Sequence, residues 1–172
     1  MSKALRLGVA GLGTVGASVI RLLAKQGNRI AVNSGQAVRV SAVSARDQSR
    51  DRGVDLSGFA WFQDPVDLAR SGEIDVFVEL IGGEDGPAEA SVRAALESGK
   101  HVVTANKALL ATHGPELFDA ADQVGASVYY EAAAAGAIPI IRPLRDSLAG
   151  DRVQRIMGIV NGTTNYILDR MD

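Results

Sequence analysis

A glycine-rich run directly after a short apolar segment constrains the fold of this chain more than any other feature. The apolar segment is Leu5–Ala10, and the run that follows, residues 11–16, reads Gly-Leu-Gly-Thr-Val-Gly. A strand, a tight turn and a helix in this order are typical of a dinucleotide-binding unit. The first glycine permits a sharp exit from the strand, the second lets a phosphate approach the backbone, and the third lets the helix over residues 17–25 pack closely on the sheet. The helix N-terminus offers free N–H groups to a pyrophosphate.

A plain strand-to-helix turn is the alternative interpretation, because glycine-rich turns are common. The position of the run between an expected strand and an expected helix favours cofactor binding. The cofactor-binding residues predicted from this run are Gly11, Leu12, Gly13, Thr14, Val15 and Gly16.

Composition narrows the classes of protein to consider. A chain of 172 residues fits one domain, or one domain and the start of another. The net charge of −2 gives no electrostatic argument for a nucleic-acid partner or an anionic membrane. The absence of cysteine excludes disulfides and thiolate metal sites. With neither a signal-peptide pattern nor an apolar run near the roughly 18 residues of a membrane span, we expect a cytoplasmic protein.

Strand and helix patterns alternate along the chain, which predicts a doubly wound, Rossmann-like α/β fold. Its sheet should be mostly parallel, with helices on both faces. The expected strands cover residues 5–10, 38–43, 74–81, 101–104, 127–130 and 153–160. The expected helices cover residues 17–25, 65–72, 87–98, 107–111, 115–124, 138–148 and 163–171. Asp64 and Asn106 are the expected N-caps of the second and fourth of these helices. A loop is expected over residues 27–37.

The end of the second expected strand bears on the choice of dinucleotide. NAD-specific sites place an acidic side chain there, where it accepts hydrogen bonds from the ribose 2′-hydroxyl. This chain has Arg46 near that position, and a planar guanidinium suits the 2′-phosphate of NADP. We therefore predict a preference for NADP, with NAD as the alternative because Asp47 follows.

Three further segments carry side chains or turns suited to a site. Residues 104–111 follow a strand, so Lys107 begins a helix at the carboxyl edge of the sheet, where doubly wound folds bind ligands. Lysine is not favoured by the dipole at a helix N-terminus, which points to a role with nicotinamide or a substrate carboxylate rather than a solvated charge. Residues 131–141 join Glu131 to a small-residue turn whose carbonyls could hold a hard cation, although a tight-packing turn is the simpler interpretation. Residues 158–168 place an Asn-Gly turn and paired threonines at a helix start, an ordinary N-cap on its own.

In this order, the motifs resemble those of the homoserine dehydrogenase family, from the glycine run almost to the last residue. Residues 78–83 are similar to the family's fourth strand and its turn. The resemblance implies NAD(P)-dependent interconversion of L-homoserine and L-aspartate 4-semialdehyde, in threonine and methionine biosynthesis, by a homodimeric enzyme. It also implies an NAD(P)-binding domain over residues 1–150 and the start of a substrate and dimerisation domain over residues 151–172.

The resemblance also implies roles for individual residues. Leu12 to Val15 and Arg46 would contact the cofactor, with Gly82 and Thr104 near its nicotinamide half. Lys107 would lie close to both cofactor and substrate, and it is the one motif-based candidate for a catalytic residue. The family's sodium site, which is structural rather than catalytic, would be formed by Glu131 and the backbones of Ala134, Gly136 and Ile138.

Hydride transfer also needs a proton acceptor within hydrogen-bond reach of the substrate hydroxyl. In the family, an aspartate and a lysine beyond the segment that matches this chain bind homoserine and move that proton. We therefore expect this chain to bind the cofactor without completing the reaction alone. The alternatives are a non-catalytic NADP-binding module and a reductase of another amino-acid semialdehyde.

Overall fold

The structure, a computed structural model, describes residues 3–158 and 162–171. It contains a six-stranded parallel sheet of strand order β3-β2-β1-β4-β5-β6. The strands are β1 (Leu5–Ala10), β2 (Val38–Ser44), β3 (Ala60–Phe62), β4 (Val76–Glu79), β5 (His101–Thr104) and β6 (Val128–Tyr129). This order is that of dinucleotide-binding doubly wound folds, and it confirms the predicted fold class. Only the short strand β3 was not predicted.

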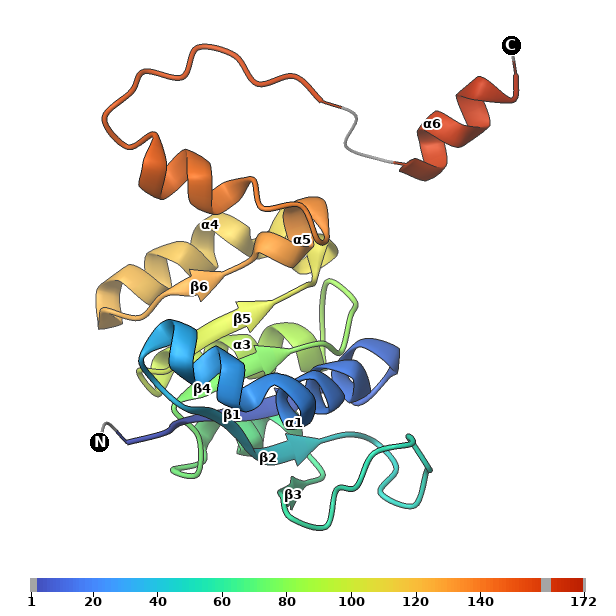
Figure 1. Cartoon of the computed structure of the whole chain (residues 1–172), viewed down its shortest axis with the longest axis vertical. Coiled ribbons are helices and arrows are strands. Elements are labelled where there is room, and N and C mark those ends of the chain that lie inside the picture. Colours follow the sequence, from blue (N-terminus) through green and yellow to red (C-terminus); the bar gives the residue numbers. More distant parts are fainter. Residues whose placement is uncertain (1–2, 159–161, 172) are drawn as a thin grey trace.

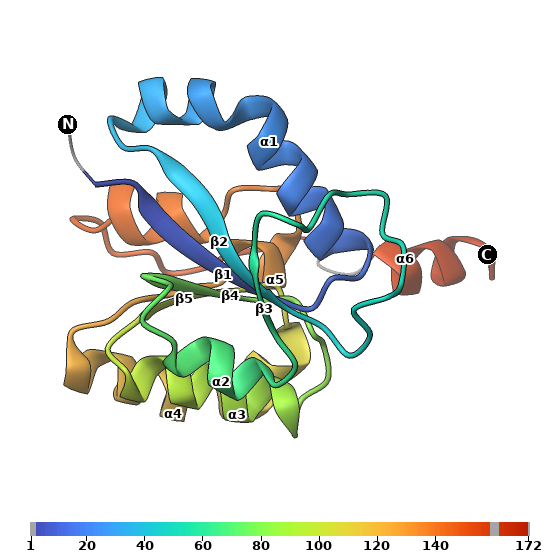
Figure 2. The same cartoon turned by 90° about the horizontal axis from the view of Figure 1, so that it is seen from below.

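Helices cover both faces of the sheet (Figure 1). Figure 2 shows α1 on one face and α2, α3 and α4 together on the other. The helices are α1 (Thr14–Ser34), α2 (Pro65–Arg70), α3 (Pro87–Glu97), α4 (Lys107–Val124), α5 (Glu131–Ala135), the π-helix η1 (Pro143–Ser147) and α6 (Gly162–Asp169). None of the helices in the described part of the chain has the length and apolarity that a membrane crossing requires.

Two apolar clusters hold these layers together. The larger lies between the sheet and α2, α3 and α4, and Phe77, Leu96 and Leu117 are fully buried in it. The smaller packs α1 against the other face through Ile20 and Val43. Burial of such side chains is worth roughly 1.5–3 kcal/mol each, so the sheet and its helices form a stable platform for the loops at its edge.

Helix α1 is longer than predicted and includes most of the expected loop over residues 27–37. Apolar residues continue at helical spacing through Leu23 and Ile30, which are both partly buried, so the helix gains packing along its length. Gly27 costs about 1 kcal/mol relative to alanine in a helix, which this packing outweighs. Gly35, in the left-handed region at φ 73°, ends the helix instead.

The two helices expected over residues 107–111 and 115–124 form the single helix α4, with Pro115 inside it. Proline removes one backbone hydrogen bond and costs about 3 kcal/mol in a helix interior. Pro115 lies on the exposed side, where water can reach the freed carbonyl. The buried stripe of Leu109, Leu117 and Ala121 continues past it and packs into the larger cluster.

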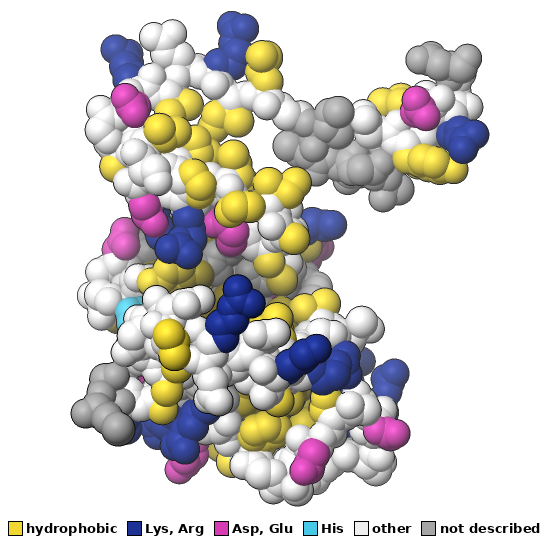
Figure 3. All heavy atoms as spheres, viewed as in Figure 1, with side chains coloured by type: hydrophobic (Ala, Val, Ile, Leu, Met, Phe, Trp, Pro, Cys, Tyr) yellow, Lys and Arg dark blue, Asp and Glu magenta, His cyan; other side chains and the backbone are white. Residues whose placement is uncertain are grey.

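The sequence prediction was least accurate after β6. The turn expected after Glu131 is the short helix α5, and the helix expected over residues 138–148 is reduced to a π-helix over Pro143–Ser147. No strand forms over residues 152–158, which are exposed and have no neighbouring strand to pair with, and the rest of that predicted strand lies outside the described residues. Helix α6 forms as expected and stands apart from the sheet in Figure 1. Figure 3 shows hydrophobic side chains on the surface of this C-terminal part. Ile156 and Met157 are among its exposed residues.

Candidate functional site

The predicted cofactor segments meet at one edge of the sheet. Backbone register pairs Ala10 with both Ser44 and Glu79, and it pairs Glu79 with Thr104. The four strands are parallel, so the loops that follow these residues all leave from the carboxyl edge. The connection after β1 leads to β2 on one side of the sheet, whereas the connection after β4 leads to β5 on the other side. The point between two such connections is the usual ligand position in doubly wound folds.

The glycine run depends on two of its glycines for steric reasons. Gly11 has φ 94°, and a Cβ there would lie 2.3 Å from the carbonyl oxygen of Leu80. A Cβ on Gly16 would lie 2.0 Å from the carbonyl oxygen of Gly11. The sharp exit from β1 is therefore confirmed. The close approach at Gly16 is to the preceding loop, rather than to the sheet as the sequence suggested.

Gly13 differs, because a Cβ there would meet no heavy atom within 4 Å. It is the N-cap of α1 and provides no side-chain cap, and the first turn of the helix has no acidic residue. The first N–H groups of α1 thus face open space with the positive end of the helix dipole. This arrangement fits a phosphate. Thr14 and Val15 are exposed beside it, whereas the side chain of Leu12 is buried and leaves only its backbone for a ligand.

Arg46 lies two residues beyond β2 and is exposed. The neighbouring Asp47 is held by Ser49, whose backbone N–H and hydroxyl donate to its Oδ1 at 2.9 and 2.7 Å. The Ser49 hydroxyl and backbone N–H lower the pKa of Asp47 below its usual value. One oxygen of the acidic group that kept NAD as an alternative is therefore engaged within its own loop, while Arg46 is exposed.

Arg52 contacts both the glycine run and the loop after β2, and the sequence interpretation missed it. Its Nε donates to the carbonyl of Leu12 at 3.2 Å, and another guanidinium nitrogen donates to the carbonyl of Asp47. The guanidinium also lies over the ring of Trp61, 5.7 Å from the ring centroid. Arg52 thus ties the glycine run to the loop after β2. No local pattern could identify it, because Leu12 is 40 residues away.

On the other side of the glycine run, Gly82 and Gly83 form the turn after β4, with φ 82° and 87°. Gly82 is exposed at this edge. Thr104 ends β5 but is almost fully buried, and its hydroxyl donates to Glu79 at 2.5 Å. Its side chain is therefore turned into the protein. Glu79 is a second residue that the sequence interpretation missed, since it lies within the strand expected over residues 74–81.

Lys107 is exposed at the start of α4, where Asn106 caps the helix by accepting the N–H of Leu109 at 3.1 Å. A pocket of about 230 Å³ opens beside it. The pocket is lined by Lys107, Leu110, Ala111, Tyr130, Ala133 and Ala134. One cationic group above an apolar lining suits a small molecule that carries an anionic group.

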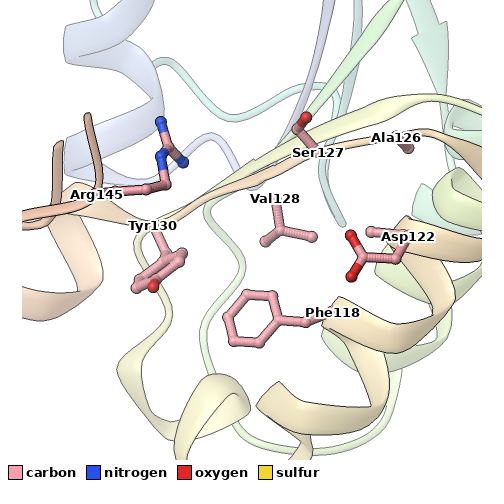
Figure 4. Close-up of a pocket in the computed structure, with 8 residues that line it drawn as sticks. Phe118, Asp122, Ala126, Ser127, Val128, Tyr130 and Arg145 are labelled. Carbon is pink, nitrogen blue, oxygen red and sulfur yellow. The ribbon is translucent and has the colours of Figure 1, made fainter. Parts of the chain in front are cut away.

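A second pocket, of about 270 Å³, lies between α4, β6 and Arg145 (Figure 4). Phe118 and Tyr130 contact each other on one side of it with ring centroids 5.2 Å apart. None of the residues predicted for the cofactor lines this pocket. It shares Tyr130 with the pocket beside Lys107.

The expected cation residues fit a cation only in part. The carboxyl group of Glu131 accepts the backbone N–H groups of Ile140, Ile141 and Arg142 at 2.5, 2.8 and 3.1 Å. Burial acts to raise the pKa of Glu131, but these N–H groups outweigh it and the net shift is downward. The side chain therefore caps the helical segment that follows. The other expected ligands are the backbone carbonyls of Ala134, Gly136 and Ile138, around the end of α5.

Asp85, Glu89 and His113 also lie close enough together to suggest a metal site. Glu89, however, is already paired with Arg93 at 2.8 Å. The two ring nitrogens of His113 face different partners, Asp85 at 3.0 Å and Glu89 at 3.9 Å. The group is better described as a polar network that joins α3, α4 and the loop after β4.

Comparison with known families gives two matches along the chain. A family model described as "Homoserine dehydrogenase, NAD binding domain" matches residues 11–131. A second, described as "Homoserine dehydrogenase", matches residues 139–172. The first match alone covers more than half of the chain and includes the glycine run, Arg46, Gly82 and Lys107.

Individual relatives agree with these matches. The chain is 47% identical over 169 residues to the homoserine dehydrogenase of Corynebacterium glutamicum and 41% identical to that of Bacillus subtilis. Each alignment covers 98% of this chain but only 38% and 39% of the relative, so the chain spans well under half the length of these proteins. A solved homoserine dehydrogenase from Thiobacillus denitrificans superimposes with a TM-score of 0.88 at 41% identity, covering 98% of this chain and 39% of that one. One from Thermoplasma acidophilum gives 0.76 at 31% identity, covering 98% and 56%.

Proposed function

The chain belongs to the homoserine dehydrogenase family, and from this premise we propose that it is the cofactor-binding part of an enzyme that interconverts L-homoserine and L-aspartate 4-semialdehyde. In the oxidation, the carbinol carbon of homoserine loses a hydride to the nicotinamide ring of NADP and the hydroxyl loses its proton to a base, which leaves the aldehyde. The bound cofactor supplies the hydride acceptor. The residues of this chain hold it and orient it.

The open N-terminus of α1 is the observation that carries this proposal. Gly13 leaves free space exactly at the helix end that offers N–H groups and positive potential, and Gly11 and Gly16 shape the backbone around it. We propose that the pyrophosphate of the cofactor occupies this space. The turn at Gly82 and the start of α4 would then border the nicotinamide half, since both follow the neighbouring strands β4 and β5.

NADP is the cofactor that the adenosine side favours. Arg46 is exposed and follows β2, where a guanidinium can meet a 2′-phosphate, whereas Oδ1 of Asp47 already accepts two hydrogen bonds from Ser49. We propose that Arg46 binds the 2′-phosphate and that Lys107 neutralises the carboxylate of the substrate.

The remaining parts of the proposal concern the whole protein. Residues 1–150 would form the cofactor domain and residues 151–172 the start of a substrate and dimerisation domain of a cytoplasmic homodimer. A sodium ion would use the carbonyls of Ala134, Gly136 and Ile138. Because the Glu131 carboxyl caps the segment after α5, the fit to a cation is partial, and no step of the reaction is assigned to one.

The cofactor proposal is tested by titrating the chain with NADPH and NADH and following nucleotide fluorescence. We expect tighter binding of NADPH. The Arg46→Ala variant should weaken NADPH binding by about 1.5–3 kcal/mol, the range for hydrogen bonds to charged groups, and leave NADH binding unchanged. Arg39→Ala is the matched control, because Arg39 is also an exposed arginine of the β2 region but lies toward the amino end of that strand.

Two results would contradict the proposal. If neither dinucleotide binds the wild-type chain, the glycine run is an ordinary turn. If Arg46→Ala weakens NADPH and NADH equally, Arg46 does not recognise the 2′-phosphate and the preference for NADP loses its basis.

A further inference from the structure

Glu79 is a buried acidic side chain to which the sequence analysis assigned no role. It is the last residue of β4 and is 0% exposed. A carboxyl group in such a place is strongly disfavoured unless its oxygens are hydrogen-bonded. Here Oε1 accepts the backbone N–H groups of Ile81 and Gly82 at 2.7 and 3.0 Å, and Oε2 accepts the hydroxyl of Thr104 at 2.5 Å. Glu79 thus binds the turn that follows its own strand and the end of the neighbouring strand.

These bonds belong to a closed ring of polar contacts. The Thr104 hydroxyl oxygen accepts the backbone N–H of Asn106 at 3.0 Å, and the Asn106 side-chain amide donates to the carbonyl of Gly83 at 2.5 Å. Gly83 follows Gly82, whose N–H returns to Glu79. The ring therefore fixes the loops after β4 and β5 relative to each other.

The ring contacts both sides of the proposed cofactor site. On one side, the Asn106 side chain also caps α4, whose first residue is Lys107. On the other, the backbone N–H of Ile81, which donates to Glu79, lies close to Gly11. A Cβ on Gly11 would be only 2.7 Å from the nitrogen of Ile81. The carboxyl group thus holds the turn after β4 firmly against the glycine run.

We propose that Glu79 is a positioning residue that preorganises the nicotinamide half of the cofactor site. It fixes the turn at Gly82 and Gly83 directly, and it fixes the start of α4 through Thr104 and Asn106. Two consecutive glycines with positive φ have many other conformations open to them, so the turn needs an anchor. Ordering this turn before the ligand arrives lowers the entropic cost of binding. The inference rests on the proposed cofactor function.

The test compares two ligands on the whole chain by calorimetry. NADPH spans both halves of the site, whereas 2′,5′-ADP carries only the adenosine half. Glu79→Ala should raise the Kd for NADPH about tenfold and leave that for 2′,5′-ADP unchanged. Glu79→Gln keeps an oxygen for Ile81 and Gly82 and loses only the acceptor for Thr104, so its Kd for NADPH should lie between the wild-type and Glu79→Ala values.

Ser91→Ala is the matched control. Ser91 is also 0% exposed, and its hydroxyl donates to the carbonyl of Ala88 within α3, away from the ring. The Ser91→Ala variant should be less stable than the wild type but should bind NADPH with the same affinity. If Glu79→Ala does not fold, Glu79→Gln against Ser91→Ala carries the same comparison. Unchanged NADPH affinity in both Glu79 variants, or an equal loss for NADPH and 2′,5′-ADP, overturns the inference. Failure of the wild-type chain to bind NADPH overturns the proposed function instead, and the inference with it.

Discussion

Gly13→Ala should weaken NADPH binding and leave the stability of the fold nearly unchanged, whereas Gly16→Ala should lower the stability, although the two glycines are only three residues apart. Gly13 has φ −76°, which alanine adopts freely, and its Cβ would meet nothing within 4 Å. Gly16 is buried, and its Cβ would lie 2.0 Å from a backbone oxygen of Gly11 that cannot rotate away. Steric contact therefore separates a position open for a ligand from one that the fold itself requires.

The magnitudes follow from the same contacts. For Gly13→Ala, the loss of a good N-cap costs about 0.5–1 kcal/mol, and restriction of the unfolded chain returns about 0.4–1 kcal/mol, so the free energy of unfolding changes little. For Gly16→Ala, better helix propensity contributes about 1 kcal/mol, but overpacking against backbone costs about 3 kcal/mol, the upper end of its usual range. The net loss of about 2 kcal/mol lowers Tm by roughly 4–8 °C.

Circular dichroism melting and NADPH titration measure both effects. Gly13→Ala should melt with the wild-type chain but raise the Kd for NADPH at least about tenfold, because its methyl group enters the space proposed for the pyrophosphate. Gly16→Ala should show the loss in Tm. The reasoning is refuted if Gly13→Ala is destabilised as much as Gly16→Ala, or if Gly13→Ala binds NADPH with wild-type affinity.

Two further predictions concern stability and the reaction. The Arg6 guanidinium, 2.6 Å from Asp75, holds the pKa of that carboxyl at about 2, so the pair stabilises the fold above pH ~4 and this contribution is lost as the pH falls through about 2. Asp75→Asn should therefore lower the free energy of unfolding by about 1 kcal/mol at pH 7, after allowance for solvent screening. Urea unfolding should show that the difference in this free energy between the variant and the wild type disappears between pH 4 and 2. A difference that does not depend on pH would contradict this prediction. A chimera in which this chain replaces the matching part of the Corynebacterium glutamicum relative should oxidise L-homoserine with NADP. In it, Lys107→Ala should lower kcat/KM by about 10- to 100-fold, and unchanged kcat/KM would remove Lys107 from the substrate site.

Some local features were read correctly from the sequence because their cause is local. Gly11 must adopt a positive φ to leave β1, and the Asp64 side chain caps α2 by accepting the N–H of Val66 at 2.8 Å. Asn106 caps α4 in the same way. Each depends on residues within a few positions of one another, so the residue types alone indicate the geometry.

Local propensity misled where packing opposed it. Gly27 and Pro115 both suggested the end of a helix, and in both places the helix continues. Beyond Pro115, Leu117 and Ala121 are buried, and beyond Gly27, Ile30 is partly buried. The carboxyl group of Glu131 accepts backbone N–H groups nine to eleven residues further along the chain, a contact that no local pattern indicated, and its role as a cation ligand stays a prediction. These outcomes depend on which surfaces meet in the folded protein.

The sequence by itself determined that this chain forms alternating strands and helices with a glycine-rich turn after the first strand, since glycine, proline and apolar spacing act over a few residues. Only the tertiary structure decided what surrounds that turn. Thr104 reaches Glu79 across 25 residues and Arg52 reaches Leu12 across 40, and both contacts exist because parallel strand register brings distant strand ends to one edge. Hydrogen-bond partners at such separations are selected by register and burial, which no local sequence pattern records.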